Sequence, residues 1–256
     1  MAGDFQASDN VRRAGGGNVG QIFAAQARRF PNDIALVDGE ERLTYAELNQ
    51  RVNRLAHVML DRGIGVGDRV GLLSRNCAPF VEVGLAVAKI GAITTSLNWR
   101  LAPTELHHCI ALTGPELMFT QDTYLPVLEG TKPPCLVFGP EYEAALAAAS
   151  DAGPQIDAGG EDGMVIMFTS GTTGMPKGAL ISHRAMIART GIYGAEMNAP
   201  AKDTFAAWTP LFHMGANDFA LATLMRGGKV ITIDGYQPDA MVAAIEAEVM
   251  HYLPLI

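Results

Sequence analysis

Residues 167–178, which read MFTSGTTGMPKG, form the most informative stretch of the sequence. The ten positions from Thr169 to Gly178 contain four hydroxyl side chains, three glycines and one lysine, Lys177. Glycine lets backbone N–H groups turn toward one point and lets a ligand approach closely. Hydroxyl groups add donors without bulk, and a lysine ammonium suits phosphate oxygens. The stretch therefore predicts a phosphate-binding loop, and a plain surface loop is the alternative.

Apolar residues flank this loop and predict strands at 164–169 and 178–182. The loop differs from a Walker A loop, in which Gly-Lys-Ser/Thr opens a helix. Here Pro176 precedes the lysine and a strand is expected to follow it. A second glycine pattern, at residues 15–20, fits GxGxxG, but no strand precedes it, so a dinucleotide site is not expected there.

Strands and helices are expected to alternate along the rest of the chain, which predicts an α/β fold with a mainly parallel sheet covered by helices. Thr44 and Glu47 form a capping-box pair that begins one helix, and apolar residues recur behind it at three- and four-residue steps. An apolar run at 219–225 suggests a further helix beginning near Phe219. The expected helices are 18–30, 45–62, 79–90, 103–112, 141–149, 183–197 and 238–248. The other expected strands are 34–37, 69–73, 92–96, 117–120, 136–139, 203–207, 229–233 and one beginning at 251–253.

Three regions are predicted from composition. Residues 1–17 are polar and glycine-rich and are expected to be mobile. Residues 18–150 form a first α/β subdomain, and a glycine-rich connection at 150–163 leads to a second one. The second subdomain, 151–256, carries the phosphate loop and is expected to be incomplete, because the chain stops just after an apolar segment.

The sequence resembles the adenylate-forming superfamily, which includes acyl-CoA synthetases, amino-acid adenylation domains and firefly luciferases. The loop at 167–178 looks like the signature loop of that superfamily. Other segments agree in order: residues 43–48 (LTYAEL), residues 88–101 followed by Glu105 and Leu106, and residues 210–213 (PLFH). The resemblance runs from about residue 20 to the end and implies the truncated N-terminal large domain of that fold.

This resemblance implies a two-step reaction. A carboxylate attacks ATP to give acyl-AMP and pyrophosphate, and a thiol, usually that of CoA, then takes the acyl group. Lys177 and Thr173 are the implied catalytic residues, and Thr172 or Thr173 would help to place Mg²⁺. The implied ligands of the triphosphate are Thr169, Ser170, Gly171, Thr172, Thr173, Gly174 and Lys177.

The segment at residues 210–215 is implied to line the pocket for the acid, with His213, Met214 and Gly215 binding the substrate. A purely structural, hydrogen-bonded role for His213 is the alternative. The apolar residues of this segment favour a fatty or aromatic acid. An amino-acid substrate would need a carboxylate for its ammonium group, and Asp218 and Asp234 are available for it. We expect Trp99 and Arg100 to support the fold.

Several motifs of the superfamily are missing: Tyr-Gly-x-Thr-Glu, Thr-Gly-Asp, the hinge and the small C-terminal domain with its catalytic lysine. We therefore expect this chain to be the N-terminal part of an acid–CoA ligase that is inactive alone. Two alternatives stay open. One is an amino-acid or carrier-protein-loading adenylation domain, and the other is a non-catalytic nucleotide-binding or interaction module from a truncated gene.

Composition limits the partners and the location. The formal net charge of −8 disfavours binding to nucleic acids. The three cysteines, Cys77, Cys109 and Cys135, have neither disulfide-framework nor zinc-site spacing. The adjacent pair His107 and His108 does not face one point on a helix, so a metal site is not expected there. No signal peptide or membrane span is evident, which favours the cytoplasm. A homodimer remains open.

Overall fold

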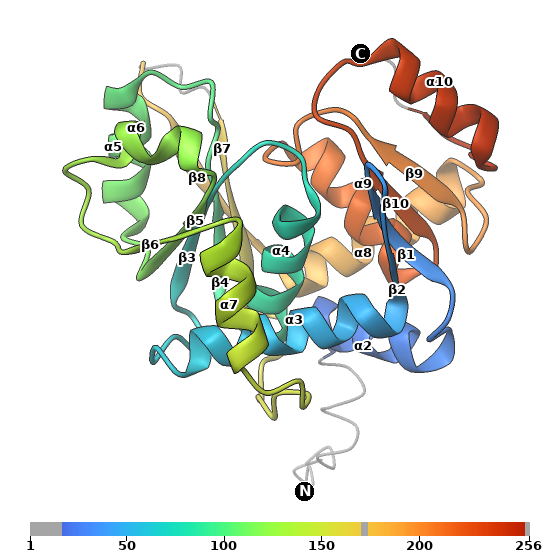
Figure 1. Ribbon diagram of the computed structural model, residues 1–256, viewed down its shortest axis with the longest axis horizontal. Helices are drawn as coiled ribbons and strands as arrows, with labels where there is room; N and C mark the ends of the chain where they lie inside the picture. The colour runs from blue at the N-terminus through green and yellow to red at the C-terminus, as the bar shows by residue number, and fades with distance from the viewer. Residues whose placement is uncertain (1–16, 170–173, 254–256) are drawn as a thin grey trace, which may run out of the picture.

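The computed structural model describes residues 17–169 and 174–253, and their strands form two sheets (Figure 1). The larger sheet has six strands in the order β6-β5-β3-β4-β7-β8. Its pairs are parallel except for β7 and β8, which form an antiparallel hairpin. In chain order its strands are β3 Arg69–Leu73, β4 Ile93–Ser96, β5 Leu117–Thr120, β6 Cys135–Val137, β7 Gly163–Thr169 and β8 Lys177–Ser182.

The smaller sheet has four strands in the order β2-β1-β10-β9. The first two strands pair antiparallel, whereas β10 pairs parallel with both β1 and β9. This sheet therefore joins the beginning of the described chain to its end. Its strands are β1 Ile34–Asp38, β2 Glu41–Thr44, β9 Thr204–Ala207 and β10 Lys229–Thr232.

Helices lie between the two sheets and on both outer faces (Figure 1). The central helices share one apolar core with the inner faces of both sheets. They are α2 Val19–Arg29, α3 Tyr45–Leu60, α4 Ala78–Ile90, α8 His183–Glu196 and α9 Met214–Met225. Helix α7 (Pro140–Ala148) packs on α3.

The outer faces carry smaller cores. Helix α5 (Pro103–Thr113) covers the larger sheet, where Leu106 and Ile110 pack with Met118 of β5, and the short elements η1 (Asp122–Tyr124) and α6 (Leu125–Leu128) lie beside it. Helix α10 (Pro238–Ala247) covers the smaller sheet through residues such as Met241. The molecule is therefore layered: outer helices, the larger sheet, the central helices, the smaller sheet and the outer helix α10. This arrangement confirms the predicted α/β class.

Local chemistry explains where the first helices begin. Thr44 and Glu47 form the predicted capping box at α3: the Thr44 side chain accepts from the Glu47 N–H, and the Glu47 carboxylate accepts from the Thr44 N–H at 2.8 Å. Asn18 and Gln21 form the equivalent box at α2. These side chains satisfy N–H groups that the first turn of a helix leaves without intrahelical partners.

Gly20 allows α2 to pack tightly against α4. A Cβ atom at this position would lie 2.7 Å from backbone atoms of Lys89 on α4. No side chain fits at that distance, so only glycine permits the observed approach of the two helices.

Most of the predicted elements are present, with boundaries that differ by one to a few residues, but three differences are informative. Helix α9 begins at Met214, five positions before the expected start near Phe219. Strand β2, which ends at Thr44, was not predicted, because its four residues carry no clear alternation. Residues 251–253 are not a strand: Tyr252 stacks on Phe219 at 4.9 Å instead of pairing with a neighbouring strand.

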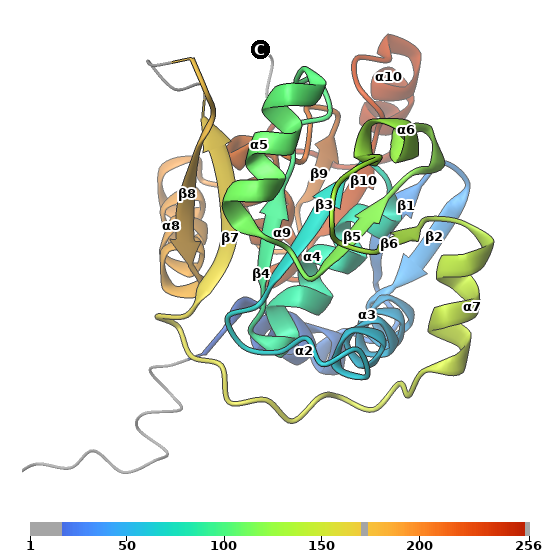
Figure 2. The same cartoon turned by 90° about the vertical axis from the view of Figure 1, so that its left-hand side faces the viewer.

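The expected boundary at residue 150 does not separate the two sheets. Strands β1 and β10 pair across it in one sheet, and β4 and β7 pair across it in the other. Residues 149–162 form no helix or strand and run along one end of the molecule, beneath α3 and α2 (Figure 2). This connection is fixed by side chains of the central helices: Asn53 donates to the Asp151 carbonyl and Asn18 to the Ala158 carbonyl.

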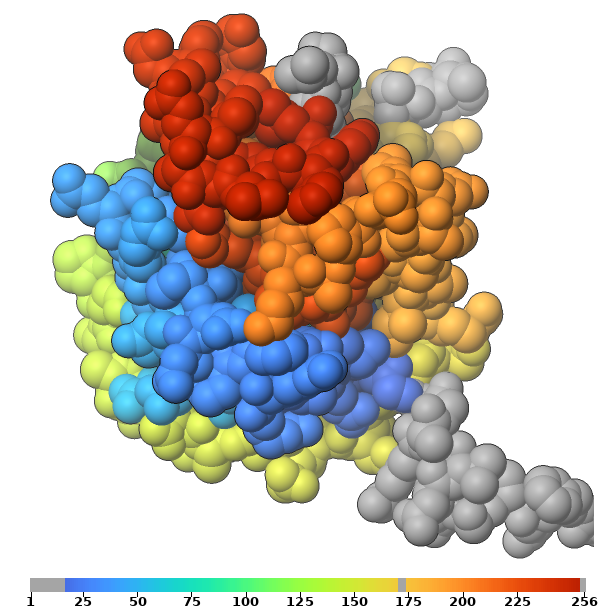
Figure 3. Space-filling model, turned by 90° about the vertical axis from the view of Figure 1, so that its right-hand side faces the viewer, coloured from blue at the N-terminus to red at the C-terminus, as the bar shows by residue number. Residues whose placement is uncertain are grey.

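The face opposite the six-stranded sheet brings distant parts of the chain together. On this face α10 lies above the first strands and helices of the chain (Figure 3). Among the helices of the described residues, none combines the length and the apolar character that crossing a bilayer requires. Of the predicted regions, residues 1–16 lie outside the described part of the chain.

His183, the first residue of α8, is fully buried and holds the start of α2. Its Nδ1 atom accepts a hydrogen bond from the Val19 N–H at 3.3 Å. Burial lowers the pKa of His183 to about 4 from 6.5, and the nearby charge of Asp162 opposes this shift only in part. The ring is therefore neutral at physiological pH, as its role as an acceptor requires.

We expect the free energy of unfolding to fall as the pH is lowered from about 6.5 to about 4, because the unfolded chain binds a proton there that the folded chain does not. The contribution of His183 to this loss should be on the order of 3 kcal/mol. His183→Asn keeps an acceptor but does not titrate, so it should remove this contribution. Urea unfolding at pH 7 and pH 4.5 measures the difference.

The matched control is His57→Asn, at a half-buried histidine whose Nε2 atom lies 3.0 Å from the Ala152 carbonyl. This variant should keep the acid sensitivity of the native chain. If His183→Asn loses as much stability on acidification as the native chain does, His183 is not the titrating group.

Candidate functional site

The β7–β8 hairpin carries the predicted phosphate loop at its tip. Thr169, the last residue of β7, lies opposite Lys177, the first residue of β8, and both side chains are exposed. Ser170, Gly171, Thr172 and Thr173 lie outside the described residues. The roles predicted for them, including that of Thr173 in catalysis and in metal binding, stay predictions.

The described end of the loop is shaped by one glycine and one histidine. Gly174 has a φ of +98°, a backbone conformation that residues other than glycine rarely adopt. The next residues return to the sheet through Pro176, which is buried and whose carbonyl accepts from His108 Nε2 of α5 at 3.2 Å. His107 bonds in another direction, to the Val127 carbonyl at 2.6 Å. The two histidines therefore bond to different backbone carbonyls.

The predicted acid-binding segment forms a turn that leads into α9. His213 is the N-cap residue of this helix, and its N–H donates to the Pro210 carbonyl at 3.0 Å. Leu211 and Phe212 are buried, whereas His213 and Gly215 are exposed and Met214 is half-buried. A Cβ atom at Gly215 would meet nothing within 4 Å. The turn thus buries its apolar residues beneath it and presents His213 and an open position outward.

An aromatic and cationic group lies beside this turn. Trp99, in the loop after β4, meets Phe212 edge-on with ring centroids 6.0 Å apart. The guanidinium groups of Arg75 and Arg100 lie 4.7 and 4.8 Å from the Trp99 ring centroid. Such cation–π contacts hold both cations next to the turn.

Partial burial and the charge of Arg100 lower the pKa of His213. The imidazole is therefore neutral at physiological pH, and it can offer one donor and one acceptor to a bound molecule. A neutral ring also avoids a second positive charge beside Arg100.

Asn76, in the loop after β3, was missed by the sequence reasoning. Its side chain is only 7% exposed, and Nδ2 donates to the carbonyls of Ala207, Thr209 and Ile233 at 2.8, 2.8 and 3.1 Å. Its Oδ1 atom accepts from the Leu211 N–H at 2.8 Å. The sequence offered one indication of this role: Asn76 is a polar residue three positions after the end of a buried strand.

These hydrogen bonds show how the two sheets are arranged. Asn76 follows the carboxyl end of β3, whereas Ala207 ends β9 and Ile233 directly follows β10. The carboxyl ends of parallel strands from both sheets therefore meet at this residue. The phosphate loop also leaves from a carboxyl end, that of β7. Open α/β sheets bind ligands at such edges, so the loop and the turn lie where this fold places a site.

The two carboxylates considered for an amino-acid substrate are both engaged. Asp218 of α9 is buried and pairs with Arg189 of α8, and it also accepts from the Tyr193 hydroxyl at 3.2 Å. Burial raises the pKa of Asp218, and Arg189 opposes this shift. Asp234 pairs with Arg75 at 3.2 Å. Both carboxylates thus already have an arginine partner.

No group of three or more His, Cys, Asp or Glu side chains suited to a metal ion gathers within residues 17–169 and 174–253. Thr172 and Thr173, which are predicted to help to place Mg²⁺, lie outside these residues, so this part of the prediction stays a prediction.

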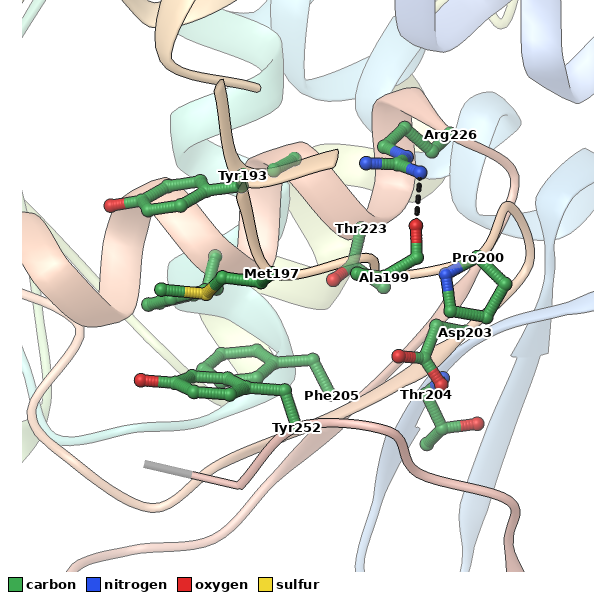
Figure 4. Close-up of a pocket in the computed structure, with 12 residues that line it drawn as sticks. Tyr193, Met197, Ala199, Pro200, Asp203, Thr204, Phe205, Thr223, Arg226 and Tyr252 are labelled. Atoms are coloured by element: carbon green, nitrogen blue, oxygen red, sulfur yellow. Dashed lines mark hydrogen bonds between the residues drawn. The ribbon is translucent and has the colours of Figure 1, made fainter. Parts of the chain in front are cut away.

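A separate pocket lies between α8, α9 and β9 (Figure 4). Its walls include the side chains of Tyr193, Phe205 and Tyr252, and Arg226 closes one side by donating to the Ala199 carbonyl. Its volume is about 40 Å³, which is close to the space of one water molecule. It contains no predicted site residue and is too small for a substrate.

A family model described as "AMP-binding enzyme" matches residues 23–256, so the chain belongs to the AMP-binding enzyme family. Among its curated relatives, a feruloyl-CoA synthase of Amycolatopsis is 34% identical over 90% of this chain and 47% of its own length. The long-chain-fatty-acid–CoA ligase FadD13 of Mycobacterium tuberculosis is 30% identical over 90% of this chain and 48% of its own length. The chain therefore spans about half the length of these relatives.

A solved structure supports the same fold. The inhibitor-bound N-terminal domain of FACL13 from Mycobacterium tuberculosis superimposes with a TM-score of 0.83 and 28% identity, over 89% of this chain and 60% of that one. This similarity confirms the expected match to the N-terminal domain of adenylate-forming enzymes.

The position of Arg100 gives a direct test of the electrostatics at the turn. Arg100→Gln should raise the pKa of His213, because it removes the positive charge that disfavours the imidazolium. Arg75→Gln is the matched control, since it removes the other guanidinium stacked on Trp99. NMR titration of the His213 ring in the three proteins measures the pKa. An equal value in Arg100→Gln and in the native chain would contradict this assignment.

Proposed function

We propose that this chain is the N-terminal part of an ATP-dependent acid–CoA ligase. The enzyme would join a carboxylic acid to AMP, release pyrophosphate and pass the acyl group to the thiol of CoA. The observation that carries the proposal is the hairpin that sets Thr169 opposite Lys177 at the two ends of the glycine- and hydroxyl-rich loop. Membership of the AMP-binding enzyme family supports it.

The first step needs a site that stabilises a leaving pyrophosphate. A carboxylate oxygen attacks the α-phosphorus, the bond to the bridging oxygen breaks, and negative charge builds on the departing group. Preorganised donors and cations lower the energy of such a transition state. Lys177 would supply the cation from the first position of β8, and the loop from Thr169 to Gly174 would supply hydroxyl and N–H donors. Mg²⁺, when bound, would neutralise further phosphate charge.

The acid would bind at the turn of residues 210–215, where His213, Met214 and Gly215 are the proposed contacts. Phe212 and Trp99 make its surroundings apolar and aromatic, and Gly215 leaves room. The ammonium group of an amino acid would need a carboxylate there, but Asp218 and Asp234 are paired with arginines. These contacts favour a fatty or aromatic acid.

The names of the relatives agree with this substrate class, since one is a feruloyl-CoA synthase and another a long-chain-fatty-acid–CoA ligase. A second candidate acceptor is a carrier-protein thiol. It is favoured by similarity to a fatty acid–[acyl-carrier-protein] ligase of Streptomyces coeruleorubidus, which is 28% identical over 84% of this chain. The proposed location is the cytoplasm, where the three free cysteines would stay reduced.

Lys177→Ala, in the enzyme that contains this chain, should reduce acid-dependent pyrophosphate release by roughly 10²–10³, the effect of losing one fixed charge-stabilising donor. Lys202→Ala is the matched control: Lys202 is also an exposed lysine, but it precedes β9 and pairs with Asp33 at 2.7 Å. The control should retain near-native rates. Comparable rates in both variants would remove Lys177 from the mechanism.

Fatty and aromatic acids should support AMP formation that depends on CoA, whereas amino acids should not, because Asp218 and Asp234, the carboxylates considered for their ammonium group, are paired with arginines. A screen of carboxylic acids, with AMP release measured with CoA and with a carrier protein in parallel, tests both parts. A clear preference for an amino acid, without thioester formation on CoA, would reject the proposed substrate class.

A further inference from the structure

Asn76 joins three segments that belong to separate parts of the fold. Its loop lies between β3 and α4, on the six-stranded sheet. Its amide contacts the ends of β9 and β10, on the four-stranded sheet, and the Leu211 N–H within the turn before α9. The side chain is buried and uses both donor hydrogens and its acceptor. Such a fully satisfied polar group in a core fixes one arrangement of the segments around it.

The turn depends on this amide for its position. Two backbone groups at its start, the carbonyl of the preceding Thr209 and the Leu211 N–H, bond to Asn76. The Leu211 carbonyl is held from the other side by Asn217 Nδ2 of α9 at 3.3 Å. His213 comes two residues after Leu211, so its position relative to the ends of both sheets follows from these bonds.

We propose that Asn76 is the positioning residue of the acid-binding turn: it sets where His213 and its neighbours stand relative to the carboxyl ends of the strands in both sheets. It is not a catalytic residue, since it is buried beneath the turn. The part of this inference that concerns the acid rests on the proposed function, whereas the anchoring of the turn does not.

Amide hydrogen exchange in the described chain tests the anchoring by itself. Asn76→Ala removes the hydrogen-bond partner of the Leu211 N–H and of the Thr209 carbonyl, whereas the Ala207 and Ile233 carbonyls keep backbone partners in the N–H groups of Ile233 and Gly235. The amides of Thr209, Leu211, Phe212 and His213 should therefore exchange at least roughly tenfold faster than in the native chain, beyond any change in global stability. The matched control is Asn53→Ala, which removes another buried amide that bonds to the Asp151 carbonyl and to Lys89. In this control, the amides of the turn should exchange no faster than those of the rest of the core.

A second substitution separates positioning from a general loss of packing. Asn76→Asp keeps an acceptor for the Leu211 N–H but turns a negative oxygen toward three carbonyls. Protonation of the introduced carboxyl gives it one donor and removes the repulsion. Protection at the turn, measured as the intrinsic exchange rate at each pH divided by the observed rate, should therefore return in part as the pH is lowered in Asn76→Asp, and not in Asn76→Ala. The absence of such a return, or uniform acceleration throughout the core in both variants, would overturn the anchoring role.

The consequence for the acid is measured in the enzyme that contains this chain. Asn76→Ala should raise KM for the acid roughly tenfold while leaving KM for ATP within about twofold, because it displaces the turn and not the hairpin. Asn53→Ala should change neither constant by more than about twofold. If KM for ATP rises as much as KM for the acid, the positioning role is wrong. If the native enzyme activates no acid at all, the proposed function fails, and the exchange measurement still decides the anchoring.

Discussion

The meeting of the two sheets depends on one buried amide, that of Asn76, which bonds to backbone groups at the carboxyl ends of β9 and β10 and within the following turn. Backbone N–H and carbonyl groups at strand ends and turns are expensive to bury unpaired. The Ala207 and Ile233 carbonyls also accept from the N–H groups of Ile233 and Gly235, and Asn76 adds to these bonds while it pairs with the Thr209 carbonyl and the Leu211 N–H. A side chain with two donors and one acceptor satisfies several of them at once. The neighbouring elements can then approach closely without trapping unpaired polar groups.

The central helices depend on similar polar contacts within an apolar layer. Glu82 of α4 is fully buried, and Arg51 of α3 and the Tyr142 hydroxyl of α7 bond to its carboxylate. Arg51 also bonds to Glu143 at 2.7 Å. Removing one partner from such a network leaves a buried charge uncompensated, which costs far more than an exposed ion pair contributes. These contacts therefore hold α3, α4 and α7 in one arrangement.

The sequence predicted the local structure well, because helix and strand periods are properties of neighbouring residues. The capping box of Thr44 and Glu47 and the strands around the phosphate loop are examples. Partner choice between strands is not local, and it was missed: nothing near β1 in the sequence indicates that it pairs with β10.

The candidate site shows the same contrast between features that are local in sequence and contacts between distant residues. Lys177 and His213 could be selected from their motifs, whereas the role of Asn76 depends on carbonyls 131 to 157 residues away. The engagement of Asp218 by Arg189 was equally hidden, because a carboxylate on a helix looks the same in sequence whether it is free or paired. Contacts of this kind require the three-dimensional structure.

The pairing of β1 with β10 has a consequence for folding during synthesis. The Thr232 hydroxyl donates to the Val37 carbonyl across 195 residues of chain. At roughly 5–20 residues per second, the ribosome needs about 10–40 s to make that intervening segment. Throughout this time β1 and β2 have no completed sheet to join, and their apolar residues must be covered by the first helices or by chaperones. Strand β1 can therefore pair with β2 soon after both are made, whereas its other edge reaches its native partner β10 only after this delay.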